Sequence, residues 1–182
     1  MRSKVIVLSL LLALVTSALA PSIGGAARVS AAVHATPVTA RAHSNPAFLD
    51  RTRFLLHMGA AYFAFHHFVY NRYRNHEFSA GAPHRTRYIV EAGIATLFAY
   101  HEVKVALGIA NGSSSNLLHA LASPLNKLGA TMGAIGNRLQ GGQYTESDIG
   151  SLNGAVSTFG KQADASGYHI SDVSVPIPGL GA

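Results

Sequence analysis

The amino-acid sequence predicts an all-α fold, an antiparallel bundle of four to five helices arranged as two hairpins. Apolar residues recur at spacings of three and four through most of positions 46–167, which is the period of an amphipathic helix. The segments with this period are separated by short stretches rich in Gly, Pro, Ser or Asn, which end helices. No stretch of the sequence gives a convincing signal for a β-strand.

The N-terminal segment has the three regions of a secretory signal peptide. Arg2 and Lys4 supply positive charge, an apolar run follows, and small residues complete the segment. We therefore expect residues 1–20 to direct export, and we expect the protein to be secreted or associated with the cell envelope. Residues 21–44 are small, polar or proline-containing with no sustained period, so we interpret them as a flexible linker.

The predicted bundle domain covers residues 45–167 and begins with a helix over residues 46–74. Asn45 is suited to the cap position and Pro46 to the first helical position, so this pair indicates a helix start. The middle of the helix is apolar on most sides, and we expect it to be buried.

A second helix is predicted over residues 83–110 and has two apolar faces of different size. Asn111 and Gly112 form a usual left-handed helix stop. The face of large residues carries Val90, Ile94, Leu97, His101 and Val105. The face of small residues carries Ala92, Ala95, Ala99 and Ala106. We expect the alanine face to permit close approach of a neighbouring helix.

The second hairpin is predicted from the most regular period in the chain. Its first segment contains Leu118, Leu121, Leu125, Leu128, Met132, Ile135 and Leu139. Pro124 lies inside this segment, and because proline lacks a backbone N–H we expect a kink or a restart there. A last helix is predicted over residues 145–167, starting at a Thr-x-x-Asp pair that resembles a capping box. The tail, residues 168–182, is expected to be extended.

The turn between the first two predicted helices concentrates positive charge and tyrosines. Its candidate residues for binding an anion or a partner are Arg72, Tyr73, Arg74, Arg85 and Arg87. Arg85 and Arg87 lie at the N-terminal end of the second predicted helix, where the dipole disfavours cations, so they need a partner or full solvation. The candidate partners are anionic lipid head groups, an anionic cell-wall polymer or an acidic protein. The alternative is that this turn only keeps a charge-poor bundle soluble.

Histidines of the first two helices are alternative candidates, for binding a metal ion or haem. His66 and His101 both lie among apolar residues, but an antiparallel hairpin offsets them by about 10 Å, too far for one ion. In such a hairpin His57 lies level with His101 and Glu102. These three residues are the alternative metal site; otherwise His57 and Glu102 form a hydrogen-bonded pair. No Glu-x-x-His pair is present, and the sequence predicts no cofactor.

Composition argues against several functional classes. Charged residues make up only 12% of the chain, and the formal net charge of +6 includes two basic residues of the signal segment. A dense Lys/Arg stripe for nucleic acid is therefore missing. The absence of cysteine means that a core, and not disulfides, stabilises the fold. Gly129, Gly133 and Gly136 line one side of a predicted helix, which favours packing inside the bundle, with formation of a homo-oligomer as the alternative.

Three stretches, "HMGAAYFAFHHFVYNRYR", "AGIATLFAYHEVK" and "LNKLGATMGAIGNRLQGG", resemble uncharacterised small secreted helical proteins of actinobacteria. The resemblance covers roughly residues 46–165 and implies no particular activity. The sequence shows no nucleophile–base signature and no glycine-rich phosphate loop. We therefore expect an exported, non-enzymatic structural or binding protein at the cell envelope, with a histidine-based metal or haem protein as the alternative.

Overall fold

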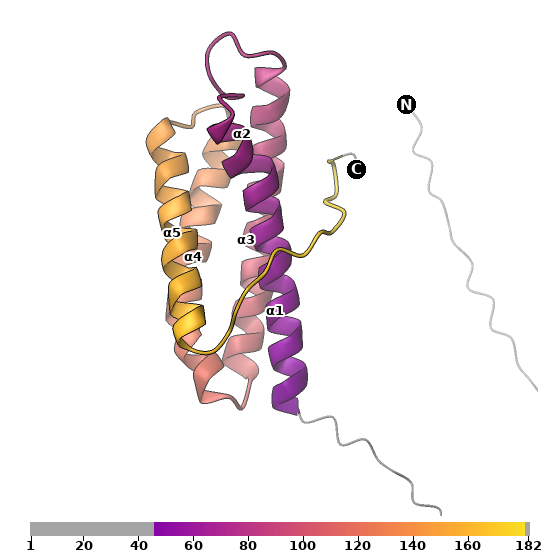
Figure 1. Cartoon of the computed structure of the whole chain (residues 1–182), viewed down its shortest axis with the longest axis vertical. Helices are drawn as coiled ribbons and strands as arrows, with labels where there is room; N and C mark the ends of the chain where they lie inside the picture. Colours follow the sequence, from indigo (N-terminus) through magenta and orange to yellow (C-terminus); the bar gives the residue numbers. More distant parts are fainter. Residues whose placement is uncertain (1–45, 181–182) are drawn as a thin grey trace, which may run out of the picture. The chain divides into compact units, whose positions relative to one another are not determined.

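The computed structural model describes residues 46–180. The predicted signal peptide, linker and N-terminal cap lie outside the described residues. Within them, the elements are α1 (Pro46–Phe65), η1 (His66–Tyr70), α2 (Asn71–Arg74), α3 (Arg85–Gly112), α4 (Asn116–Gln140) and α5 (Glu146–Ala165). Residues 46–180 contain no β-strand, and the predicted all-α bundle is confirmed (Figure 1).

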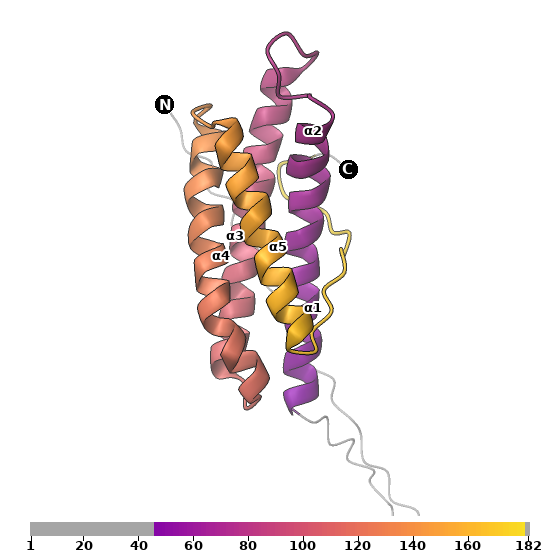
Figure 2. The same ribbon diagram turned by 60° about the vertical axis from the view of Figure 1, so that its left-hand side comes forward.

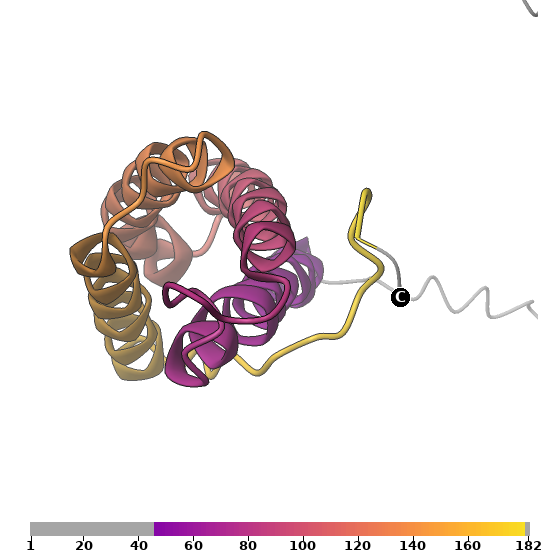
Figure 3. The same ribbon diagram turned by 90° about the horizontal axis from the view of Figure 1, so that it is seen from above.

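Successive long helices run in opposite directions and enclose one core. Figures 1 and 2 show α1, with its continuation through η1 and α2, beside α3, and α4 beside α5. Viewed from above in Figure 3, the helices form a ring in which α3 packs against both α1 and α4. A hydrogen bond from the Tyr62 hydroxyl of α1 to the Val156 carbonyl of α5, at 3.1 Å, closes the ring.

The core is supplied mainly by the leucine-rich period of α4 and its counterparts on the other helices. From α4 it contains Leu118, Leu121, Leu125, Leu128, Met132, Ile135 and Leu139, none more than 2% exposed. From α5 it contains Ile149, Leu152, Val156, Phe159 and Ala163. Phe54, Met58 and Phe65 of α1 complete the core. Each fully buried large apolar side chain contributes about 1.5–3 kcal/mol, so these residues together supply much of the stability.

The buried face of α3 is the alanine face, and the large residues lie at its edges. Ala92, Ala95, Ala99, Ala106 and Ala110 are fully buried. Val90 is 43% exposed, and His101 is exposed, so the prediction that His101 lies among buried apolar residues is wrong. The reason is spatial: two helices pack against α3 at once, and its buried face consists mainly of alanines, with Ile89, Thr96 and Val103.

Glycines in α3 and α4 permit this close approach. A Cβ added at Gly93 would lie 2.8 Å from the backbone nitrogen of Gln140, where α4 ends. A Cβ at Gly136 would lie 2.9 Å from a methyl of Leu97, and Gly133 contacts the ring of Tyr100. The glycine side of α4 is therefore packed against α3 inside the bundle.

Two helices differ locally from the sequence-based expectation. α4 continues through Pro124 without a restart. The carbonyl that loses its partner there belongs to Ala120, which is exposed, so water can replace the missing hydrogen bond. The first helix contains one turn of π-helix, η1, in which the Asn71 N–H bonds to the His66 carbonyl. The extra residue shifts the register of every side chain beyond it.

The ends of α5 follow the prediction more closely. Thr145 and Asp148 form a complete capping box, in which each side chain accepts a hydrogen bond from the other residue's backbone N–H. The hydrogen bond from the Thr145 N–H, and then that from Arg138, lowers the pKa of Asp148. Residues beyond α5, from 168 to 180, contain no helix or strand and cross the outer side of α1 (Figure 1).

We expect Gly93→Ala to lower the free energy of unfolding by about 1–3 kcal/mol, because its methyl group meets backbone and not a flexible side chain. The matched control is Gly108→Ala in the same helix, where a Cβ would find nothing within 4 Å. There alanine should raise the free energy of unfolding by about 0.5–1 kcal/mol through helix propensity alone. Urea unfolding followed by circular dichroism measures both, and equal stability of the two variants would contradict the packing described.

Candidate functional site

The loop between α2 and α3, residues 75–84, contains two unusual backbone conformations. His76 has φ of 58° and His84 has φ of 57°, both in the left-handed region. This conformation costs an L-residue about 1–2 kcal/mol, whereas glycine adopts it freely. The same loop contains Gly81 at φ of 84°. The loop therefore holds two side chains at positions where glycine would be more stable, and such positions concentrate at functional sites.

Arg72 holds this end of the bundle together. Its terminal nitrogens donate to Glu77 Oε2 at 3.1 Å and to Glu91 Oε2 at 2.8 Å. Its guanidinium carbon lies 4.0 Å from the ring centroid of Tyr88, and its side chain is only 19% exposed. Half-buried and paired with two carboxylates, Arg72 joins the end of the first helix to α3.

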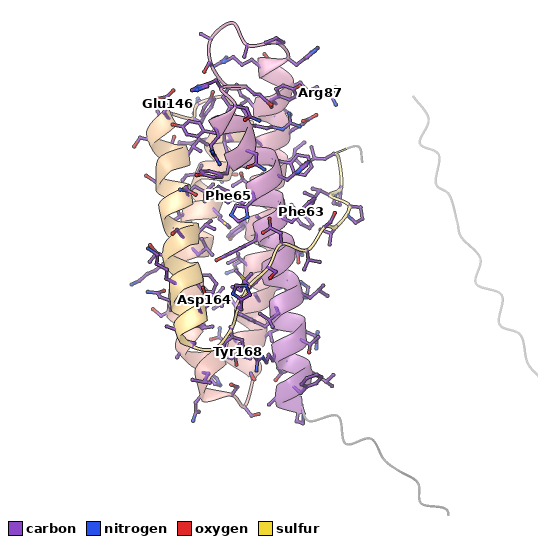
Figure 4. All side chains as sticks on the ribbon, viewed as in Figure 1. Phe63, Phe65, Arg87, Glu146, Asp164 and Tyr168 are labelled. Carbon is purple, nitrogen blue, oxygen red and sulfur yellow. The ribbon has the colours of Figure 1, made fainter. Side chains whose placement is uncertain are left out.

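Arg85 and Arg87 begin α3 and are both exposed. Arg85 Nε donates to the Phe78 carbonyl at 2.8 Å, and Arg87 Nε donates to Glu91 Oε1 at 2.7 Å. The Arg87 side chain is 74% exposed, and Figure 4 shows it at the loop end of the bundle. Because both hydrogen bonds use Nε, the terminal nitrogens of these two side chains keep donors for a ligand.

Arg74 and Tyr73 line a pocket of about 190 Å³ at the same end of the bundle. The other lining residues are His76, Phe78, Ser79, Tyr144 and Glu146. The Tyr144 hydroxyl donates to the Phe78 carbonyl at 3.1 Å, which fixes the loop against the start of α5. Arg74 is exposed, and its guanidinium carbon lies 5.8 Å from the ring centroid of Tyr70. Arg74 forms no ion pair with any residue of 46–180.

The four predicted arginines therefore divide into two groups. Arg72 is neutralised by glutamates and serves the fold. Arg74 forms no ion pair with any residue of 46–180, and Arg85 and Arg87 use only Nε, toward the Phe78 carbonyl and Glu91. These three side chains flank the loop and keep donors for an anion. We call these three residues, together with Tyr73, His76 and His84, the basic turn.

The N-terminal end of helix α3 favours an anion at the basic turn. It contains no acidic residue, and the cap residue, His84, makes no capping hydrogen bond with its side chain. The positive end of the α3 dipole thus adds to the arginines and is not offset by an acidic side chain of the first turn.

The histidines of the alternative site form separate hydrogen bonds. His57 Nδ1 lies 2.6 Å from Glu102 Oε2, as the antiparallel register predicts. His101 is exposed and does not join them. His66 Nδ1 lies 2.9 and 3.0 Å from the two oxygens of Asp172 in the C-terminal segment. Among residues 46–180, no three His, Asp or Glu side chains gather as a metal site requires.

Comparison of the chain with known protein families, with curated proteins and with solved structures found no match. The resemblance to small secreted proteins of actinobacteria therefore stays a prediction. The molecule belongs, by its fold, to the class of antiparallel helical bundles, and its function has to be argued from the geometry of its surface.

Sequence reasoning identified the arginines of the basic turn but not the two strained histidines. Histidine is several-fold enriched among left-handed residues other than glycine, but the chain has ten histidines and no local pattern marks His76 or His84 among them. One signal was present: His84 follows Pro83 directly and comes immediately before the start of α3. The C-terminal segment was also missed as a packing element, since its partners are distant in the sequence, as the separation of 106 between His66 and Asp172 shows.

We expect Arg72→Ala to lower the free energy of unfolding by about 2 kcal/mol, because two charge-assisted hydrogen bonds are lost from a half-buried site. Arg74→Ala is the matched control and should change it by less than about 0.5 kcal/mol, as an unpaired surface residue does. Denaturant unfolding of both variants makes the comparison. An Arg72→Ala variant as stable as the wild type would show that Arg72 contributes no more to stability than the exposed arginines do.

Proposed function

We propose that the protein is exported and acts as a non-enzymatic helical binding protein at the cell envelope, where the basic turn binds a phosphate-bearing anionic surface. Export rests on the signal-peptide pattern of residues 1–20. The observation that carries the binding proposal is the left-handed conformation of His76 and His84. This conformation costs stability, and the two imidazole side chains belong to the same turn as Arg74, Arg85 and Arg87.

Phosphate is the anion that the donors of the basic turn suit best. A guanidinium group presents two parallel N–H donors that match two phosphate oxygens, and three such groups are available here. The Tyr73 side chain in the pocket beside Arg74 adds a hydroxyl group. The α3 N-terminus adds backbone dipoles of the same sign. A bound phosphate would also account for Arg85 and Arg87 lying where the helix dipole disfavours cations.

A peripheral contact with the envelope agrees with the packing of the bundle. Within residues 46–180, α3 is the one helix long and apolar enough to cross a membrane. Its alanine face, however, is buried against α1 and α4, as expected of the central helix of a bundle. The basic turn lies at one end of that bundle, where it can reach a surface without rearrangement (Figure 4).

The first test is sedimentation of the protein with lipid vesicles. We expect binding to vesicles that contain phosphatidylglycerol, none to phosphatidylcholine alone, and a steep loss of binding as salt is raised. The double variant Arg74→Ala/Arg87→Ala should bind about tenfold or more weakly, since each basic residue near an anionic surface contributes about 1 kcal/mol.

The matched control is Lys104→Ala/Lys127→Ala, which removes the same charge from two exposed residues outside the basic turn. It should bind like the wild type. If both double variants lost vesicle binding equally, net charge alone would explain the binding. The basic turn would then not be the binding site. A parallel titration with soluble polyphosphate separates the two sources of phosphate: competition with vesicles indicates a shared site, and polyphosphate binding alone indicates a polymer.

A second test uses the conformational strain itself. His76→Gly and His84→Gly should each raise the free energy of unfolding by about 1 kcal/mol, because glycine relieves the left-handed conformation. Both variants should also bind the anionic vesicles more weakly.

The control for this test is Ala80→Gly in the same loop, where φ is not positive and no stabilisation is expected. Unchanged binding by the stabilised histidine variants would mean that the two imidazoles have no part in recognition.

A further inference from the structure

The C-terminal segment forms a strap over the outer side of the first helix. We use the name strap for residues 168–180. At its start Tyr168 is buried and packs edge-on against Phe54, with ring centroids 5.6 Å apart. Further along, the Asp172 carboxylate accepts a hydrogen bond from His66, and the Val173 N–H donates to the Gly59 carbonyl at 3.0 Å. Near its end Ile177 is buried.

Beyond the anchor at Val173, the strap and the first helix line a half-open cavity of about 430 Å³. This is more than twice the volume of the pocket at the basic turn and falls within the roughly 300–1,000 Å³ typical of sites for small molecules. The helix contributes Phe63, His67, Phe68 and Arg72, and the strap contributes Ser174, Val175, Pro176, Ile177 and Leu180. Figure 4 shows Phe63 on the side of the helix toward the strap and Phe65 on the side toward the bundle.

The helix wall of this cavity is aromatic and partly built by the π-turn. Phe63 and His67 stack with an interplanar angle of 16° and centroids 5.4 Å apart. Phe68 stands edge-on to Phe63 at 89°. His67 and Phe68 both belong to the π-turn η1, a feature that often occurs at functional sites. The opposite wall is aliphatic, so a flat apolar molecule fits between them.

The polar groups that line the cavity can form hydrogen bonds but add no net charge to it. The His67 side chain makes no hydrogen bond or ion pair with any residue of 46–180, and the backbone N–H groups of Ser174 and Val175 likewise lack a partner there. Arg72 is already neutralised by Glu77 and Glu91. An ionised ligand would therefore find no compensating charge, whereas a neutral ligand would find free donors and acceptors.

We propose that this cavity binds a small uncharged molecule with a planar aromatic ring and a hydrogen-bonding group at its edge. The ring packs against the stacked Phe63 and His67, and the edge group bonds to the His67 imidazole or to the backbone of the strap. The strap is a wall of the site, so its attachment to the helix controls binding. This site is separate from the basic turn and does not depend on the proposed contact with phosphate.

Gly59 offers a way to detach the strap without changing a residue that lines the cavity. A Cβ at Gly59 would lie 2.5 Å from Val173 Cγ2 and 2.6 Å from the Ser171 carbonyl oxygen. Alanine is compatible with the helix itself, so Gly59→Ala displaces the strap and leaves α1 intact. Gly108→Ala, whose Cβ meets nothing within 4 Å, is the matched control.

The experiment titrates the full chain with 6-propionyl-2-(dimethylamino)naphthalene, an uncharged planar fluorophore with a carbonyl group. We expect saturable binding of one molecule per chain with a blue-shifted emission. Gly59→Ala should weaken binding at least tenfold, and Gly108→Ala should bind like the wild type. Absence of saturable binding by the wild type, or equal binding by Gly59→Ala, would overturn the proposal.

A second variant guards against a general loss of structure. Val175→Trp places a large ring in the cavity while the strap anchors at Tyr168, Asp172 and Val173 stay in place. This substitution should abolish fluorophore binding. The circular dichroism spectrum and the binding to vesicles should stay those of the wild type. Fluorophore binding that survives in this filled variant would show that the dye binds elsewhere, and would also overturn the proposal.

Discussion

The constraint on which the structure depends is the close passage of α3 between α1 and α4. Five alanines with no exposed surface make up most of its buried face, and Gly93 abuts the backbone at the end of α4. Methyl groups bury little area, so the apolar stabilisation comes from the large side chains of the neighbouring helices that pack onto this smooth face. The antiparallel register of α1 and α3 brings His57 to Glu102. The ends of α1 and α3, and hence the basic turn, are positioned by the same contact.

Charge on this molecule is used sparingly, which makes its distribution informative. Of the arginines beside the loop between α2 and α3, Arg72 is enclosed by Glu77 and Glu91, whereas Arg74 has no acidic partner among the described residues. One arginine therefore stabilises the loop and the others remain on its surface. The strained histidines lie between them in the sequence, and their conformational cost is the observation on which the proposed binding role rests.

The sequence was sufficient to predict the helices whose apolar residues recur at regular spacing. The spacing of Leu118, Leu125 and Leu139 predicts both a helix and its buried face, and the Thr145–Asp148 pair predicts the start of α5, because local geometry decides both. It failed where the outcome depends on distant groups. His101 has apolar neighbours in the sequence, yet the two helices packed on α3 leave it outside. The strap cavity arises from contacts between the first helix and residues at the far end of the chain, which no local pattern contains.

The strap has a consequence for the order in which the chain folds. Its anchor between Asp172 and His66 joins residues 106 positions apart, whereas the helices form from neighbours. Closing so long a loop is slow and gains little until the first helix already presents its surface. The strap should therefore dock last during folding and separate first during unfolding, while the bundle beneath it is still intact. A cavity whose wall opens before the core does can exchange its contents without unfolding of the protein.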